Sequence, residues 1–75
     1  MGFCLKIWET EDDREMGETF SHTPEDTSLE GAIVGAQKLF NRMNYAAIEV
    51  IDEDDENEET HYHISNDVPD GERYE

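Results

Sequence analysis

The feature that most limits how this chain can fold is one segment, residues 29–43, with the period of an amphipathic helix. Apolar residues recur there at steps of three and four, which predicts a helix whose apolar side packs against a sheet. The stripe consists of Leu29, Ile33, Ala36, Phe40 and Met43, widened by Ala32 and Leu39. Residues Thr27 to Glu30 match a capping box led by the Thr27 hydroxyl, and Asn44 is expected to end the helix.

Four segments are predicted to form β-strands, two before the helix and two after it, and all but the second alternate between apolar and polar residues. They are residues 3–9, 18–23, 46–52 and 60–65. In the first of them Phe3, Leu5 and Ile7 share one side, which is the period of a β-strand. Pro24 is expected to end the second strand, because proline cannot donate a hydrogen bond to a sheet. Residues 10–17 offer little to bury and are predicted to form a loop.

The predicted element order is β-β-α-β-β, which is an α+β fold. Its simplest packing is a four-stranded antiparallel sheet with one helix packed on one face. We expect residues 1–65 to form this domain and residues 66–75, which include Pro69 and Gly71, to form an acidic, flexible C-terminal tail. The other sheet face would be uncovered, which allows a homodimer through that face.

Charge limits the partners that such a domain can have. The 75 residues carry 21 Asp and Glu against five Lys and Arg, a formal net charge of -16. This field repels nucleic acids and anionic membranes, both of which proteins hold through Lys and Arg, so direct binding to either is not expected. The chain has one cysteine and no apolar run near the roughly 20 residues that span a bilayer. We therefore expect a soluble protein of the cytoplasm.

Candidate sites for chemistry are few. His61 and His63 share one strand face and His22 lies on another strand, so a metal site has to be weighed. A strand-spaced pair without a fixed third ligand is more typical of a polar sheet face, and no metal or other cofactor is predicted. Cys4 has no motif around it and is interpreted as a packing residue. No pair of carboxylates is singled out for acid–base catalysis, so we predict no catalytic residue and no enzyme.

Two acidic clusters are the remaining signal. Alternate residues of an extended chain lie about 6.6–6.8 Å apart, close to two base-pair steps of about 3.4 Å along a DNA strand, so rows of carboxylates can replace phosphates. A solvated charge run is the alternative for either cluster alone. Trp8, Tyr45 and Tyr62 are candidates for an aromatic anchor beside them. The clusters are Glu9, Glu11, Asp12, Asp13 and Glu15, and Asp52, Glu53, Asp54, Asp55, Glu56, Glu58 and Glu59.

In size, charge and the layout of strands around a helix, the chain resembles the small DNA-mimic inhibitors of phages and mobile elements, of the anti-restriction and anti-CRISPR types. The resemblance implies a non-catalytic inhibitor that occupies the basic channel of a nuclease or CRISPR effector in the host cytoplasm. It rests on the composition of the whole chain and transfers no functional residue. Two alternatives stay open: a structural or housekeeping module adapted to high internal salt, and an acidic antitoxin or adaptor that binds one basic protein.

Overall fold

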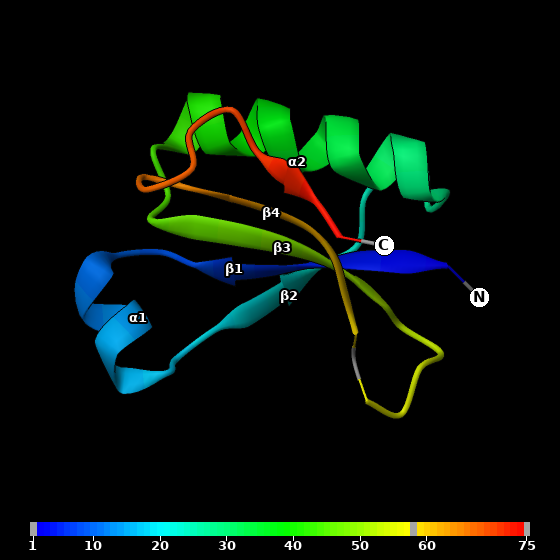
Figure 1. Cartoon of the computed structure of the whole chain (residues 1–75), viewed down its shortest axis with the longest axis horizontal. Coiled ribbons are helices and arrows are strands. Elements are labelled where there is room, and N and C mark those ends of the chain that lie inside the picture. The colour runs from blue at the N-terminus through cyan, green and yellow to red at the C-terminus, as the bar shows by residue number, and fades with distance from the viewer. Residues whose placement is uncertain (1, 58, 75) are drawn as a thin grey trace.

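The computed structural model describes residues 2–57 and 59–74, which form an antiparallel sheet of five strands with two helices (Figure 1). The strands are β1 (Phe3–Trp8), β2 (Phe20–His22), β3 (Ala47–Asp52), β4 (Thr60–Ser65) and β5 (Glu72–Arg73). The helices are α1 (Glu11–Met16) and α2 (Leu29–Met43). The α+β class and the antiparallel sheet are confirmed, whereas the predicted four strands and one helix are five strands and two helices.

The strand order β2-β1-β3-β4-β5 makes β3 the central strand of the sheet and β1 one of its two neighbours. These two strands pair along their whole length, from Phe3 opposite Asp52 to Trp8 opposite Ala47. Both predicted hairpins are present, since β2 pairs with β1 and β4 pairs with β3. Because β2 and β3 are both antiparallel to β1, they run parallel to each other. The helix α2 connects them and crosses one face of the sheet (Figure 1).

The core lies between α2 and this face. The helix contributes Ala32, Ile33, Ala36 and Phe40, and the strands contribute Leu5, Ile7, Ile48, Val50, Tyr62 and Ile64. Leu29 and Leu39 are partly buried beside them, as the helical stripe predicted. Met43 was expected in the stripe but is 50% exposed. It is the last residue of α2, where the chain turns away towards β3.

The helix α2 begins one residue later than the capping box predicted. Ser28 is the N-cap, and its hydroxyl accepts a hydrogen bond from the backbone three residues further on, at 3.1 Å. Thr27 has another role, because its carbonyl accepts a 2.9 Å hydrogen bond from the Phe3 amide and joins this loop to β1. Asp26 orders the turn by accepting from the Ser28 amide at 3.0 Å. The predicted helix end is confirmed, since Asn44 is the C-cap in the left-handed conformation.

Residues 10–17, which were predicted to form a loop, contain α1. The Thr10 hydroxyl accepts from the Asp13 amide at 3.1 Å and caps the helix. Three acidic residues fill the first turn, where the positive end of the helix dipole favours them. Gly17 ends the helix with φ 73, a conformation that glycine adopts without steric cost. No residue of α1 is buried, so the helix has no apolar stripe and only its caps indicate it.

The segment predicted as a C-terminal tail supplies the fifth strand. β5 pairs with β4, with Arg73 opposite Tyr62. Arg73 also donates two 2.7 Å hydrogen bonds to the Glu30 carboxylate on α2. Gly71 has φ 80 and lies against the Tyr62 hydroxyl, where a larger residue would collide. The strand forms through contacts with residues elsewhere in the chain, Tyr62 and Glu30. The sequence carries no signal for it, because Glu72 and Arg73 are both polar and show no alternation.

Candidate functional site

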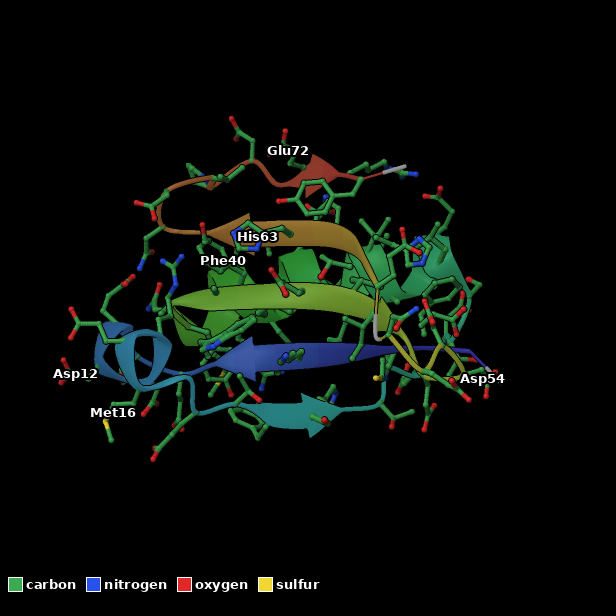
Figure 2. All side chains as sticks on the ribbon, turned by 60° about the horizontal axis from the view of Figure 1, so that its bottom comes forward. Asp12, Met16, Phe40, Asp54, His63 and Glu72 are labelled. Atoms are coloured by element: carbon green, nitrogen blue, oxygen red, sulfur yellow. The ribbon has the colours of Figure 1, made fainter. Side chains whose placement is uncertain are left out.

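The two acidic clusters lie at opposite ends of the sheet, where Asp12 and Asp54 mark them in Figure 2. The first cluster follows the end of β1, and the second occupies the turn between β3 and β4 beside the start of β1. The six residues of β1 separate them, and five steps of about 3.4 Å amount to roughly 17 Å. The structure therefore does not join the clusters into one row. Glu58 lies outside the described residues.

We call these ends the α1 pole and the turn pole. The α1 pole consists of Glu9, Glu11, Asp12, Asp13, Glu15 and also Asp67, which the sequence did not indicate. The turn pole consists of Asp52, Glu53, Asp54, Asp55, Glu56 and Glu59.

The α1 pole is held together by Arg14. Its Nη1 lies 3.3 Å from a Glu11 carboxylate oxygen and 3.4 Å from one of Asp67. Asn66 donates a further hydrogen bond to Glu11 at 3.0 Å. These bonds connect α1 to the loop after β4 and bring Asp67 into the pole. Asp12 is exposed and forms no ion pair with the described residues, so the solvent side of α1 stays negative.

The turn pole is ordered by its own carboxylates. Asp52 accepts from the Asp54 amide at 3.0 Å, and Asp55 accepts from the Asn57 amide at 3.0 Å. Aspartate side chains that bond to the backbone two residues on are a common way of fixing a turn. Two carboxylates therefore hold the frame, while others such as Glu53 are exposed on it. The acidic turn is hydrogen-bonded and regular rather than an unstructured loop.

The loop before α2 adds charge beside the turn pole. The N-terminal backbone links this loop to the turn pole. The Gly2 carbonyl accepts a hydrogen bond from the Glu53 amide at 3.0 Å, and the Phe3 amide donates one to the Thr27 carbonyl in the loop. Glu25 and Asp26 directly precede Thr27, so they lie on the loop that these two hydrogen bonds connect to the turn pole. Hydrogen bonds from Ser28, first from its amide, lower the pKa of Asp26 below its ordinary value. This carboxylate is accordingly held in its charged form.

Repulsion within each pole is appreciable. Two carboxylates about 7 Å apart repel each other by about 0.6 kcal/mol in a water-like medium. The α1 pole places five acidic residues within positions 9–15, and the turn pole places six described ones within positions 52–59. Of the five Lys and Arg side chains, Arg14 alone forms ion pairs with described pole residues. Arg73 is bound to Glu30, and Lys38 and Arg42 are exposed on α2. A cationic partner at either pole would relieve this repulsion.

The sheet face opposite α2 lies between the poles and carries mainly polar side chains (Figure 2). His63 Nδ1 lies 2.9 Å from a Glu49 carboxylate oxygen. Lys6 lies over the Trp8 ring, with Nζ 5.4 Å from the ring centroid. Trp8, Glu49 and His63 line a shallow hollow of about 230 Å³. Cys4 is buried, as expected for a packing residue. A homodimer through this face stays a prediction.

The three aromatic candidates differ in access to a partner. Tyr62 is 3% exposed, and its hydroxyl accepts from the Gln37 amide group at 3.1 Å, so it lies in the core and cannot reach a partner in this conformation. Tyr45 packs edge-on against Phe20, with ring centroids 5.8 Å apart. Trp8 lies half-buried on the face between the poles and is the aromatic contact that the fold leaves there.

The three histidines do not converge. His22 lies on edge strand β2, three strand positions from β4, or roughly 14 Å at about 4.8 Å per position. The His61 ring packs edge-on against Phe3, with centroids 5.2 Å apart, whereas His63 bonds to Glu49. Across residues 2–57 and 59–74, no three His, Cys, Asp or Glu side chains come close enough to hold a metal ion.

Within the described ranges, no helix has both the length and the apolar character needed to cross a membrane. Comparisons with protein-family models, curated proteins and solved structures found no match for this chain. The function has to be inferred from the geometry and charge of the two poles.

Proposed function

We propose that this protein binds the basic nucleic-acid channel of another protein and blocks it without carrying out a reaction. The observation that supports this most directly is the placement of carboxylates on two hydrogen-bonded frames, α1 and the β3–β4 turn, at the ends of one small sheet. In size, net charge and the layout of strands around a helix, the protein resembles the DNA-mimic inhibitors of phages and mobile elements. A nuclease or a CRISPR effector is the proposed partner.

The separation of the poles refines how such mimicry would work. Phosphates follow one another about every 3.4 Å along a DNA strand, so β1, which lies between the poles and is roughly 17 Å long, spans about five base-pair steps. The poles would occupy two phosphate-binding patches of a channel instead of one continuous row. Trp8 lies on the face between them, and the cations Lys38 and Arg42 lie on α2 behind the sheet. We infer that the open sheet face and the poles enter the channel while α2 points outwards.

Salt dependence is the expected signature of this interaction. A basic channel releases bound anions, and the poles release bound cations, when the two surfaces meet, so affinity falls as the salt concentration rises. Binding also relieves the repulsion inside each pole. Because salt already screens this repulsion, that contribution to the affinity likewise falls as the salt concentration rises.

The first prediction concerns neutralisation of each pole. One variant carries Glu53→Gln and Glu56→Gln, and the other carries Asp12→Asn and Glu15→Gln, so that each loses two exposed negative charges. Competition against fluorescent duplex DNA, on a panel that includes a restriction endonuclease and a CRISPR effector, measures the affinity. Two exposed ion pairs at about 0.5–1 kcal/mol each predict a loss of about 5- to 30-fold for each variant at low salt.

A matched control separates local from overall charge. The double variant Asn41→Lys and Met43→Lys also raises the net charge by two, but on exposed positions of α2. It should lose much less affinity than either pole variant. Equal losses in all three variants, or inhibition that is unchanged between 50 and 300 mM salt, would falsify mimicry at the poles.

The salt-adapted module remains the alternative, because pole repulsion needs screening and the chain has only two lysines. Circular dichroism at decreasing salt distinguishes the salt-adapted module from the DNA mimic. A salt-adapted module unfolds when salt is removed, whereas a mimic stays folded at the low salt concentration where it binds most tightly. An acidic antitoxin or adaptor would instead inhibit one basic toxin and none of the nucleic-acid-binding panel.

A further inference from the structure

A cavity of about 500 Å³ lies between edge strand β2 and helix α2, away from the face that joins the poles. Leu5, Pro24, Val34 and Leu39 give it an apolar lining. Val34 is 45% exposed, so this apolar side chain of α2 faces the groove and solvent instead of the core. The volume is within the range of about 300–1,000 Å³ typical of ligand sites. We call this cavity the β2 groove.

The strand beside the groove is open to pairing. β2 lies at the end of the sheet order, and β1 is its sole partner among the described strands. All three of its residues are exposed, and His22 lines the groove. An edge strand presents unpaired N–H and C=O groups on its outer side, to which an extended peptide can add as a further strand.

Gly35 is the observation that points to an occupant. A glycine inside a helix is unfavourable relative to alanine. A Cβ at Gly35 would meet Pro24 at 3.5 Å, which is an ordinary contact, so packing within the chain does not require glycine here. Gly31 is different, because the Asp26 side chain fills the space where its Cβ would lie. Because Gly35 has no side chain, the groove has more space against the helix backbone at this position.

The length of the groove matches a short extended segment. Its helix wall runs from Glu30 to Leu39, nine steps of about 1.5 Å or roughly 13.5 Å. An extended chain covers about 3.3 Å per residue, so about four residues fit, with about two side chains directed towards the apolar lining.

We propose that the β2 groove binds an extended segment of a partner protein, which adds to β2 as a strand, directs alternate apolar side chains to Val34 and Leu39, and carries Lys or Arg beside Glu25 and Asp26. Charge decides between this occupant and a second copy of the chain. A second copy would bring another net -16 against the acidic residues that flank β2. The proposal goes beyond the blocking of a basic channel, because it depends on the apolar groove and the strand edge and requires no mimicry.

The second prediction tests the groove with peptides. A random decapeptide library displayed on phage is selected on the native protein, and the selected peptides are synthesised and their affinities measured by calorimetry. We expect sequences that alternate apolar and basic residues. Val34→Lys places a charge in the apolar lining and should lower the affinity of the selected peptides at least about tenfold. Met43→Lys, an equally exposed apolar position of α2 outside the groove, should leave the affinity unchanged.

Two further readouts fix the mode of binding. Gly35→Ala should raise the melting temperature of the free protein and yet weaken the peptides, a combination that general damage to the fold does not produce. Amide chemical shifts in the ¹⁵N-labelled protein should change at residues 20–22 and 34–39. The pole-neutralised variants should keep peptide binding, which separates this proposal from mimicry. Selection of no peptide, equal binding to Val34→Lys, or shift changes confined to the poles would each overturn it.

Discussion

Glu30 and Arg73 are two exposed residues that join the last strand to the main helix through paired 2.7 Å hydrogen bonds. The bonds from Arg73 lower the pKa of Glu30 below its ordinary value of 4.5 and raise that of Arg73. A carboxyl with a depressed pKa in the folded state stabilises the fold above its unfolded pKa, and this contribution disappears as pH falls through the folded pKa. Both side chains are solvent-exposed, so screening keeps the effect small.

The third prediction follows from this linkage. Glu30→Gln should lower the free energy of unfolding near pH 7, and the difference from the natural chain should begin to shrink as the pH falls to the ordinary Glu pKa of 4.5 and vanish only below the lowered pKa of the folded state. Urea unfolding at a series of pH values measures it. Arg73→Gln removes the same pair from the other side and should show the same profile. A difference that persists unchanged at pH 3 would mean that Glu30 contributes through packing and not through its charge.

At the scale of elements, the start of α2 shows how a tertiary contact selects between two adjacent caps. Thr27 and Ser28 are both good N-cap residues, and the sequence favoured Thr27 because Glu30 completes a capping box. The structure uses the Thr27 carbonyl to bind β1 and leaves the cap to Ser28. Formation of the sheet therefore sets the first residue of the helix.

The fourth prediction compares these two positions. Ser28→Ala should destabilise the protein by about 1 kcal/mol because it removes the capping hydrogen bond. Thr27→Ala should cost less, since its main-chain bond to β1 remains. Chemical denaturation of both variants gives the comparison. If Thr27→Ala proves the more damaging substitution, the capping box describes the helix start in solution better than the Ser28 cap does.

At the scale of the whole molecule, the core of the described residues lies between α2 and one face of the sheet. The chain carries a formal net charge of -16, so its surface is strongly acidic. For 75 residues, a stability of about 0.05–0.15 kcal/mol per residue amounts to roughly 4–11 kcal/mol. Self-repulsion reduces this value and salt restores part of it. Losses in the core are therefore felt by the entire fold.

The fifth prediction is that Phe40→Ala lowers the free energy of unfolding by about 3–5 kcal/mol, because its ring is buried between α2 and the sheet (Figure 2). At low salt this loss should leave much of the protein unfolded. Met43→Ala, three residues further along the same helix but exposed, should change stability by about 0.5 kcal/mol or less. Thermal unfolding followed by circular dichroism is sufficient, and similar losses in the two variants would show that the core is not where the structure places it.

The sequence predicted the elements that are defined by local periodicity. Residues 60–65 have the predicted bounds, α2 ends at the predicted residue but begins one residue later than the Thr27 capping box indicated, and the two hairpins come from the strands predicted on either side of this helix. The helix α1 was also within reach of the sequence, because Thr10, three acids and Gly17 are start and stop signals. It was missed because a helix that buries nothing has no apolar stripe.

The sequence alone determined the α+β class, the antiparallel pairing and the sign of the surface charge, because hydrophobic period and composition are local properties. Only the tertiary structure decided that the acidic clusters lie at opposite ends of the sheet, that Tyr62 is in the core and that residues 72–73 form a strand. Those outcomes depend on which strand pairs with which and on contacts between residues far apart in the chain. Neither has a period or a motif that a linear sequence displays.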